Sequence, residues 1–232
     1  MMRKAKYAWV LLACMGQAVT AQDLKVAGLK TEHLECPMGV DTASPRLMWH
    51  MVSDRKGARQ QSYRLLVGQD SAQVAAGEGD AWDTGVMASD CISARYDGKP
   101  LKPRTRYYWQ VAVTDETGRK ALSDVAYFET GKMGMDAWQG NWISDSRDCH
   151  HQPAPYFRRK FSVDKPVRSA RIYVAVAGLY QLHFNGKRLG DTMLDPVYTR
   201  FDRRNMYVTY DVTSAIKLPE NVVGIVLGNG WY

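Results

Sequence analysis

The sequence predicts an all-β protein built from two consecutive β-sandwiches. Helical periodicity is nearly absent along the 232 residues, whereas short runs of alternating apolar and polar residues recur. Gly, Pro, Asn and Asp bound these runs, which is typical of sandwiches made of short strands. A chain of this length accommodates one large domain or two small ones. We expect domains at residues 22–131 and 137–232, joined by a short linker at 132–136.

Residues 1–21 carry the features of a secretory signal peptide. Three basic residues open the segment, an apolar run follows, and Ala18–Ala21 offers small residues at a cleavage site. A lipobox that ends at Cys14 is the alternative, ranked second because its apolar run has only about seven residues. We therefore expect export to the periplasm or the cell exterior, and no other segment approaches membrane-spanning length.

The net charge argues against a nucleic-acid partner. It is +7 for the whole chain, and it falls to +4 without residues 1–21, which hold three basic and no acidic side chains. Arg158–Lys160 and Arg203–Arg204 are short basic groups within strand-like sequence. We interpret both groups as solvated strand edges, because a polyanion site needs a longer basic cluster.

Three cysteines remain after cleavage behind Ala21, namely Cys36, Cys91 and Cys149. An odd number leaves at least one thiol free in an exported protein. The sequence alone does not decide whether Cys36 and Cys91 form a disulfide. The preferred interpretation is that all three are small, buried, apolar side chains.

The first domain is expected to contain five strand segments. Their ranges are Arg46–Met51, Gln61–Gly68, Trp82–Val86, Leu101–Val113 and Ala121–Thr130. In the fourth segment the spacing Leu-x-Pro-x-Thr-x-Tyr ends at Tyr107, which is the spacing of a tyrosine corner. Such a phenol hydroxyl bonds to upstream backbone, and Tyr107, Trp109, Val111 and Val113 alternate on the inward face. The domain is therefore predicted to be a fibronectin type III or immunoglobulin-like sandwich.

The second domain is expected to be a jelly-roll-like sandwich that is truncated at its C-terminal end. Its strand segments are Ala154–Phe161, Ser169–Ala177, Tyr180–Phe184, Met206–Val212 and Val222–Leu227. Asn185-Gly186 follows the third segment directly. This pair is the strongest short hairpin signal, because type I′ turns need a positive φ at both central residues.

No catalytic or metal motif is apparent in the sequence. It contains no nucleophile elbow, no phosphate-binding loop and no His-Glu-x-x-His. Asp148–His151 is the only dense run of metal-ligating residue types, but neighbours on an extended chain point apart, so we expect a loop there. Asp191 and Asp195 are interpreted as turn side chains rather than as a pair for glycoside hydrolysis. We therefore expect no catalytic residue and no metal ligand.

Sugar binding is the chemistry that the second domain favours. Sugar sites combine an aromatic face with planar polar groups that bond hydroxyls. The candidate residues for such contacts are Asn185, Asp191, Asp195, Tyr198, Arg203 and Trp231.

Several of these residues also carry a family resemblance. The hairpin Asn185–Asp191, followed by Asp195-Pro196, Tyr210–Thr213 and Leu227–Tyr232, resembles the N-terminal region of bacterial α-L-rhamnosidases. The order of a fibronectin-like sandwich before a jelly roll is similar to that family as well. One departure is visible, since Val197-Tyr198 follows Pro196 where the family usually has Gly-Trp.

The resemblance implies a parent enzyme that hydrolyses terminal α-L-rhamnosides with inversion. It also implies a catalytic (α/α)₆ barrel downstream of Tyr232. The present chain would then be a non-catalytic fragment that supports domain packing and recognition of a rhamnose-containing glycan. Some related modules bind rhamnose with calcium, which makes calcium a candidate ion near Asp191, Asp195 and Tyr198. The alternatives are a stand-alone cell-surface carbohydrate-binding or adhesion protein, and a different multidomain glycosidase.

Overall fold

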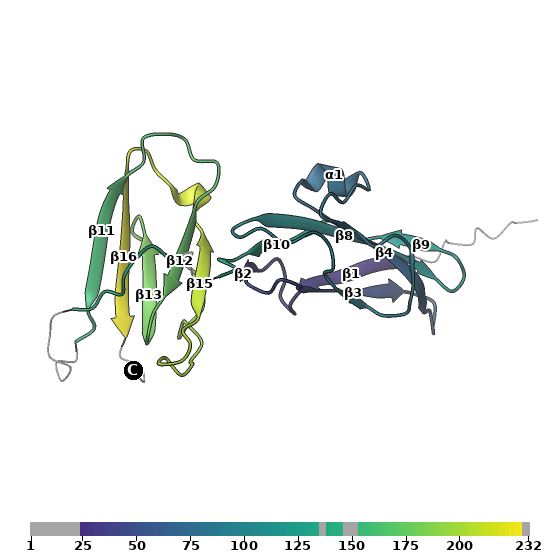
Figure 1. Ribbon diagram of the computed structural model, residues 1–232, viewed down its shortest axis with the longest axis horizontal. Coiled ribbons are helices and arrows are strands. Elements are labelled where there is room, and N and C mark those ends of the chain that lie inside the picture. Colours follow the sequence, from purple (N-terminus) through teal and green to yellow (C-terminus); the bar gives the residue numbers. More distant parts are fainter. Residues whose placement is uncertain (1–23, 135–137, 146–152, 229–232) are drawn as a thin grey trace, which may run out of the picture.

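The protein consists of two β-sandwiches that follow one another along the chain (Figure 1). The computed structural model describes residues 24–134, 138–145 and 153–228. Strands dominate these ranges, which confirms the predicted all-β fold class. The predicted signal peptide and the residues at the predicted 136/137 boundary lie outside the described residues. No helix in the described ranges is both long and apolar enough to cross a membrane.

The first sandwich packs a small sheet against a larger one. The small sheet has the order β1 (Leu24–Thr31), β3 (Arg46–Ser53) and β7 (Ser93–Arg95), all antiparallel. The larger sheet has the order β2 (Met38–Val40), β10 (Ala126–Thr130), β8 (Arg106–Asp115), β4 (Gln60–Gly68) and β5 (Trp82–Asp83). Two short strands extend it, with β6 (Met87–Ala88) beside β4 and β9 (Lys120–Leu122) beside β8.

The core of the first sandwich follows the predicted alternation on β8. Tyr107, Trp109, Val111 and Val113 are at most 2% exposed, and they pack with residues of the facing sheet such as Trp49. The tyrosine corner is confirmed, because the Lys102 backbone N–H donates to the Tyr107 hydroxyl at 2.9 Å. The bond joins the loop before β8 to the middle of the core, so it fixes where the strand enters the sandwich.

Two local features of the first sandwich differ from expectation. The expected strand 121–130 is divided into β9 and β10, since the Ser123 hydroxyl accepts the Val111 N–H and its carbonyl accepts from Gln110. A short helix, α1 (Ser71–Ala75), was not expected. Asp70 caps it by accepting two backbone N–H groups, as short polar side chains do before a first helical turn.

The two cysteines that the structure describes are free, and the interpretation that they are buried was wrong for both. Cys91 is exposed and Cys36 is half-buried, and neither forms a disulfide. Cys91 lies in a surface segment where its N–H is bound by the Ser89 hydroxyl, so local turn geometry rather than apolar packing sets its position. Cys149 lies outside the described residues.

The second sandwich faces a four-stranded sheet with a two-stranded one. The larger has the order β11 (Tyr156–Ser162), β16 (Glu220–Gly228), β13 (Leu179–Phe184) and β14 (Lys187–Arg188). The smaller pairs β12 (Arg171–Ala175) with β15 (Tyr207–Asp211). These strands, counted over the described ranges, are fewer than the eight of a full jelly roll. Tyr180, Leu182 and Phe184 are at most 7% exposed, as their alternation predicts.

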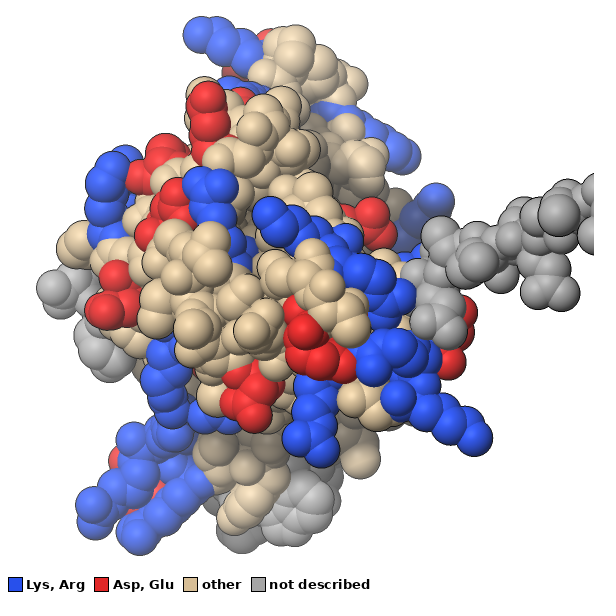
Figure 2. Space-filling model, turned by 90° about the vertical axis from the view of Figure 1, so that its right-hand side faces the viewer, with Lys and Arg blue, Asp and Glu red and all other residues tan. Residues whose placement is uncertain are grey.

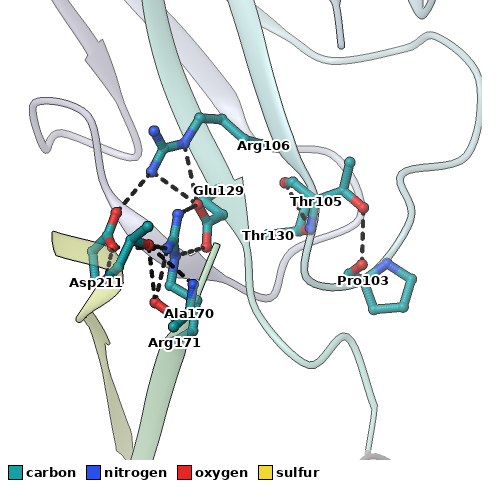
Figure 3. Close-up of polar contacts among 9 residues, drawn as sticks. Pro103, Thr105, Arg106, Glu129, Thr130, Ala170, Arg171 and Asp211 are labelled. Carbon is teal, nitrogen blue, oxygen red and sulfur yellow. Dashed lines mark hydrogen bonds and ion pairs between the residues drawn. The ribbon is translucent and has the colours of Figure 1, made fainter. Parts of the chain in front are cut away.

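The two sandwiches are joined by a network of charged side chains (Figure 3). The Arg171 guanidinium on β12 forms a bidentate pair with Glu129 on β10, at 2.6 and 2.8 Å. Arg106 on β8 donates to the same carboxylate, and both arginines also contact Asp211 on β15. Glu129 is only 3% exposed. The planar guanidinium fork matches a carboxylate in geometry, so this network fixes the orientation of one sandwich relative to the other.

The chain between the sandwiches is part of the same interface. The Lys132 N–H donates to the Tyr207 hydroxyl at 2.9 Å, and the Met133 N–H donates to Asp41 at 2.8 Å. A Cβ at Gly131 would lie 1.9 Å from that hydroxyl, so no side chain fits there. Residues 131–133 of the predicted junction are thus packed against both domains.

Acidic and basic side chains are mixed on the face of the molecule drawn in Figure 2. Asp and Glu side chains are interspersed among the Lys and Arg side chains on this face. On the second sandwich, Arg158–Lys160 is exposed on β11, and Lys160 pairs with Glu220 of the neighbouring strand. These three basic residues lie on a solvated edge strand, as the sequence predicts. Arg203–Arg204 is also exposed but lies in the loop before β15, so its placement on a strand edge was wrong.

Candidate functional site

The candidate site lies at one end of the second sandwich, where a long loop joins the β13–β14 hairpin to β15 (Figure 1). The hairpin turn is the predicted one, with φ values of 49° at Asn185 and 82° at Gly186. Both central residues are in the left-handed region, which matches a type I′ turn. The turn directs the chain into residues 191–205, which contain most of the predicted sugar-contact candidates.

The side-chain amide of Asn185 makes hydrogen bonds through both its nitrogen and its oxygen, and these bonds hold neighbouring segments together. Its amide nitrogen donates to the Ala215 carbonyl and to Asn221, at 2.8 and 2.9 Å, and its amide oxygen accepts the Val222 N–H. Asn221 itself is fully buried. The amide of Asn185 therefore acts as part of the backbone network between the hairpin and β16, and sugar contact by this side chain stays a prediction.

Asp191 and Asp195 take different positions in the loop. Asp191 is exposed, whereas the Asp195 carboxylate accepts hydrogen bonds from the hydroxyls of Thr192 and Tyr210. The Asp195 backbone carbonyl also accepts the Tyr180 N–H at 3.1 Å. Across the described ranges no group of three His, Cys, Asp or Glu residues converges. These two aspartates therefore do not fit the many oxygen ligands that calcium takes.

Two tyrosines beneath the loop are held in the neutral form. Burial raises the pKa of Tyr180, and its hydrogen bond with Tyr210 at 2.9 Å raises it further. Burial also raises the pKa of Tyr210. Both hydroxyls consequently remain protonated at neutral pH, and Tyr210 can donate to Asp195 and so fix the middle of the loop.

Tyr198 and Arg203 both face solvent, with 61% of Tyr198 exposed. The Tyr198 ring meets Phe201 edge to face, with centroids 5.7 Å apart. Arg203 lies 4.0 Å from Asp202, and its side chain is 73% exposed. Trp231 lies outside the described residues, as does the run Asp148–His151.

Phe201 connects this loop to a groove of about 640 Å³. The groove opens between the two sheets and is bounded by the segment before β11. Its apolar lining comes from β11, β12 and β16 and from the loop, and includes Phe157, Val176, Ile225 and Leu227. Trp142, which is 68% exposed, and Asn205 contribute the aromatic face and the planar polar group. This is the combination of surfaces that sugar sites use.

One buried acceptor in the groove lining has no partner among the described residues. Asn205 donates from its amide nitrogen to the Phe201 carbonyl at 2.9 Å, but its amide oxygen is buried without a hydrogen bond. Leaving such an acceptor unpaired is costly, so a donor from a ligand would stabilise the site. Among the lining residues the only carboxyl group is that of Asp145. Glycoside hydrolysis usually needs two carboxyl groups, and the described residues of the groove supply one.

Sequence reasoning placed Tyr198 and Asp195 in one loop but missed three residues of the groove. Trp142, Phe201 and Asn205 come from separate segments and meet only in the folded sandwich. The single signal available was the density of aromatic residues around Trp142, which did not distinguish an exposed ring from a core one.

Comparisons with known proteins place both sandwiches in one kind of polypeptide. Residues 26–134 match a family model described as "Rha78A-like, N-terminal immunoglobulin domain". Residues 165–232 match a second one, described as "Alpha-L-rhamnosidase N-terminal domain".

Individual relatives agree with both matches. An α-L-rhamnosidase of Formosa agariphila is 31% identical over 84% of this chain and 23% of its own length. One from Alteromonas sp. is 31% identical over 95% of this chain and 25% of its own. The solved α-L-rhamnosidase of Dictyoglumus thermophilum superposes with a TM-score of 0.83 and 34% identity, covering 89% of this chain and 25% of that structure. The chain thus spans about a quarter of the length of these relatives.

Proposed function

Since this chain belongs to the α-L-rhamnosidase family through its two N-terminal domains, we propose that it is the accessory region of an exported enzyme that removes terminal α-L-rhamnose from glycans or glycosides. The observation that carries the proposal is the match of both sandwiches, in order, to domains of such enzymes. In this proposal the catalytic residues lie in a different part of the full-length polypeptide, and the present chain contributes substrate recognition and domain packing.

The groove is the proposed place of recognition. A pyranose ring would stack on the exposed face of Trp142, while a sugar hydroxyl donates to the unpaired amide oxygen of Asn205. L-Rhamnose carries a methyl group where most hexoses carry a hydroxymethyl group. The aliphatic side chains of Val176 and Ile225 in the lining favour such a methyl group, because they offer no partner to a hydroxyl.

Export is part of the same proposal. Residues 1–21 have the composition of a signal peptide. Detection of the processed protein in the periplasm or culture medium, with a new N-terminus at Gln22, would support it. A protein that keeps residues 1–21 inside the cell would contradict it.

Recognition is tested on the full-length polypeptide that carries this chain. Trp142→Ala is expected to raise KM roughly tenfold on a rhamnose-rich polysaccharide with kcat unchanged, because stacking energy is lost without change to the catalytic residues. Tyr156→Ala is the matched control, since Tyr156 is 78% exposed on β11 and does not line the groove. Equal KM values for the two variants would contradict a sugar contact in the groove.

A further inference from the structure

In the loop between β14 and β15, three apolar side chains face solvent while a charged one is half-buried. Met193, Leu194 and Val197 are 71%, 72% and 73% exposed, while Asp195 is half-buried and Pro196 is buried between them. We call the three exposed side chains the apolar knob. Single exposed apolar residues are ordinary on protein surfaces, but several on one short loop mark an interaction surface.

The apolar knob is held outward by the contacts of its polar neighbours. The Asp195 carbonyl accepts the Tyr180 N–H, and its carboxylate accepts from Thr192 and Tyr210. Arg188 donates to the Thr192 carbonyl at 2.6 Å. Turning the apolar side chains inward would break these bonds and remove the acceptor of the N–H of buried Tyr180, so the outward conformation is built into the fold.

We propose that the apolar knob is the surface through which this region docks onto the catalytic part of the same rhamnosidase polypeptide, an inference that rests on the proposed function. The chain spans only 23–25% of its curated relatives, so most of their polypeptide is tethered to this region. A tether raises the effective concentration of a partner surface, which lets a small apolar contact persist. The loop thereby sets where the groove lies relative to the catalytic residues.

Charge around the apolar knob favours that partner over a second copy of this chain. Residues 187–204 hold five basic and three acidic side chains, and Arg188, Arg200 and Arg203 are exposed. A symmetric dimer through the knob would bring this basic rim against itself. The docking surface is instead expected to have an apolar centre and an acidic rim.

Hydroxyl-radical footprinting of the full-length polypeptide tests the docking surface, with Met87 as an internal control. In the present structure Met193 is 71% exposed and Met87 on β6 is 45% exposed. Methionine oxidation follows exposure, so an undocked Met193 is oxidised faster than Met87. If the apolar knob is docked, the order is reversed, and Met193 is oxidised roughly fivefold more slowly than Met87. Oxidation of Met193 at or above the rate of Met87 overturns the proposal.

A pair of matched variants identifies what covers the apolar knob. Val197→Asp is expected to restore rapid oxidation of Met193, whereas Val86→Asp, at an equally exposed valine of the first sandwich, leaves it protected. Protection that disappears on dilution indicates a second copy, and protection that requires added L-rhamnose indicates a sugar site; either result overturns docking in cis. An assay with an aryl α-L-rhamnoside on the same protein tests the proposed function separately. Hydrolysis of the aryl α-L-rhamnoside together with an unprotected Met193 would overturn the docking surface and leave the proposed function in place.

Discussion

Glu129 of the first sandwich and Arg171 of the second form a bidentate ion pair across the domain boundary, at 2.6 and 2.8 Å. The carboxylate is almost fully buried, and the guanidinium side chain is 13% exposed. The Glu129 hydrogen bond raises the pKa of Arg171 and outweighs its burial. The two sandwiches are therefore joined by a contact that solvent screens little.

Removing the Glu129 carboxylate is expected to destabilise this interface strongly. Glu129→Gln leaves Arg106 and Arg171 with only the more exposed Asp211 as a shared anion, and breaking a buried pair in this way costs about 3–5 kcal/mol. Denaturant unfolding should show a lower midpoint, with the second sandwich unfolding first. Glu220→Gln is the control, because the pair of Glu220 with Lys160 is exposed and contributes about 0–1 kcal/mol. Equal losses in both variants would contradict a stabilising interface.

Gly131 offers a steric test of the same interface. Gly131→Ala places a methyl group against the Tyr207 hydroxyl and Asp41, and the required shift should cost roughly 1–3 kcal/mol. Gly134→Ala is the matched control, since a Cβ there meets nothing within 4 Å. Thermal unfolding should separate the two variants. If the Gly131→Ala variant unfolds at the wild-type temperature, the close packing of Gly131 against Tyr207 and Asp41 would be contradicted.

The tyrosine corner should be sensitive to loss of a single oxygen atom. Tyr107→Phe leaves the Lys102 N–H without its acceptor, at an expected cost of about 1–3 kcal/mol. Tyr156→Phe removes a hydroxyl from an exposed ring and should change the unfolding free energy little. Denaturant titration monitored by tryptophan fluorescence measures both. A neutral Tyr107→Phe would show that the corner contributes nothing to stability.

Asp115 is expected to make the first sandwich acid-sensitive. Burial alone would raise the pKa of this carboxyl, but hydrogen bonds from Thr117 and Arg119 outweigh burial and hold the pKa well below its usual range. A carboxyl group with a depressed pKa stabilises the fold above the unfolded-state pKa of about 3.9, and that stability is lost as the pH falls.

Unfolding free energies at pH 7 and pH 3 check the role of Asp115. Asp115→Asn should be less stable than wild type at pH 7 and should lose less on acidification. Asp124→Asn, at an exposed position beside β9, should keep the wild-type dependence. If Asp115→Asn loses as much unfolding free energy between pH 7 and pH 3 as wild type does, the acid sensitivity belongs to other groups.

The parts of the fold that could be predicted are those set by local spacing. The tyrosine corner and the Asn185-Gly186 turn each depend on a few neighbouring residues, and both are present as expected. The division of strand 121–130 could not be predicted, because it depends on Ser123 replacing a strand contact with bonds to distant β8. The exposure of Cys91 was missed because a cysteine is usually a small apolar core residue, whereas the hydrogen bond from its N–H to the Ser89 hydroxyl holds it in a surface turn.

The candidate site was predictable only in part. Asp195 and Tyr198 could be placed in one loop, because they are close in sequence and surrounded by turn residues. Trp142, Phe201 and Asn205 could not be brought together, since the groove forms only when two sheets and a loop meet. Nor could the sequence reveal that the amide of Asn185 is saturated by residues on and before β16.

The most direct test of the whole account is the hydrolysis of an aryl α-L-rhamnoside by the full-length polypeptide, measured beside residues 22–232 alone. We expect release of L-rhamnose by the full-length polypeptide and no turnover by residues 22–232. Hydrolysis of other aryl glycosides without any action on the α-L-rhamnoside would contradict the proposed substrate. Turnover by residues 22–232 alone would contradict the accessory role.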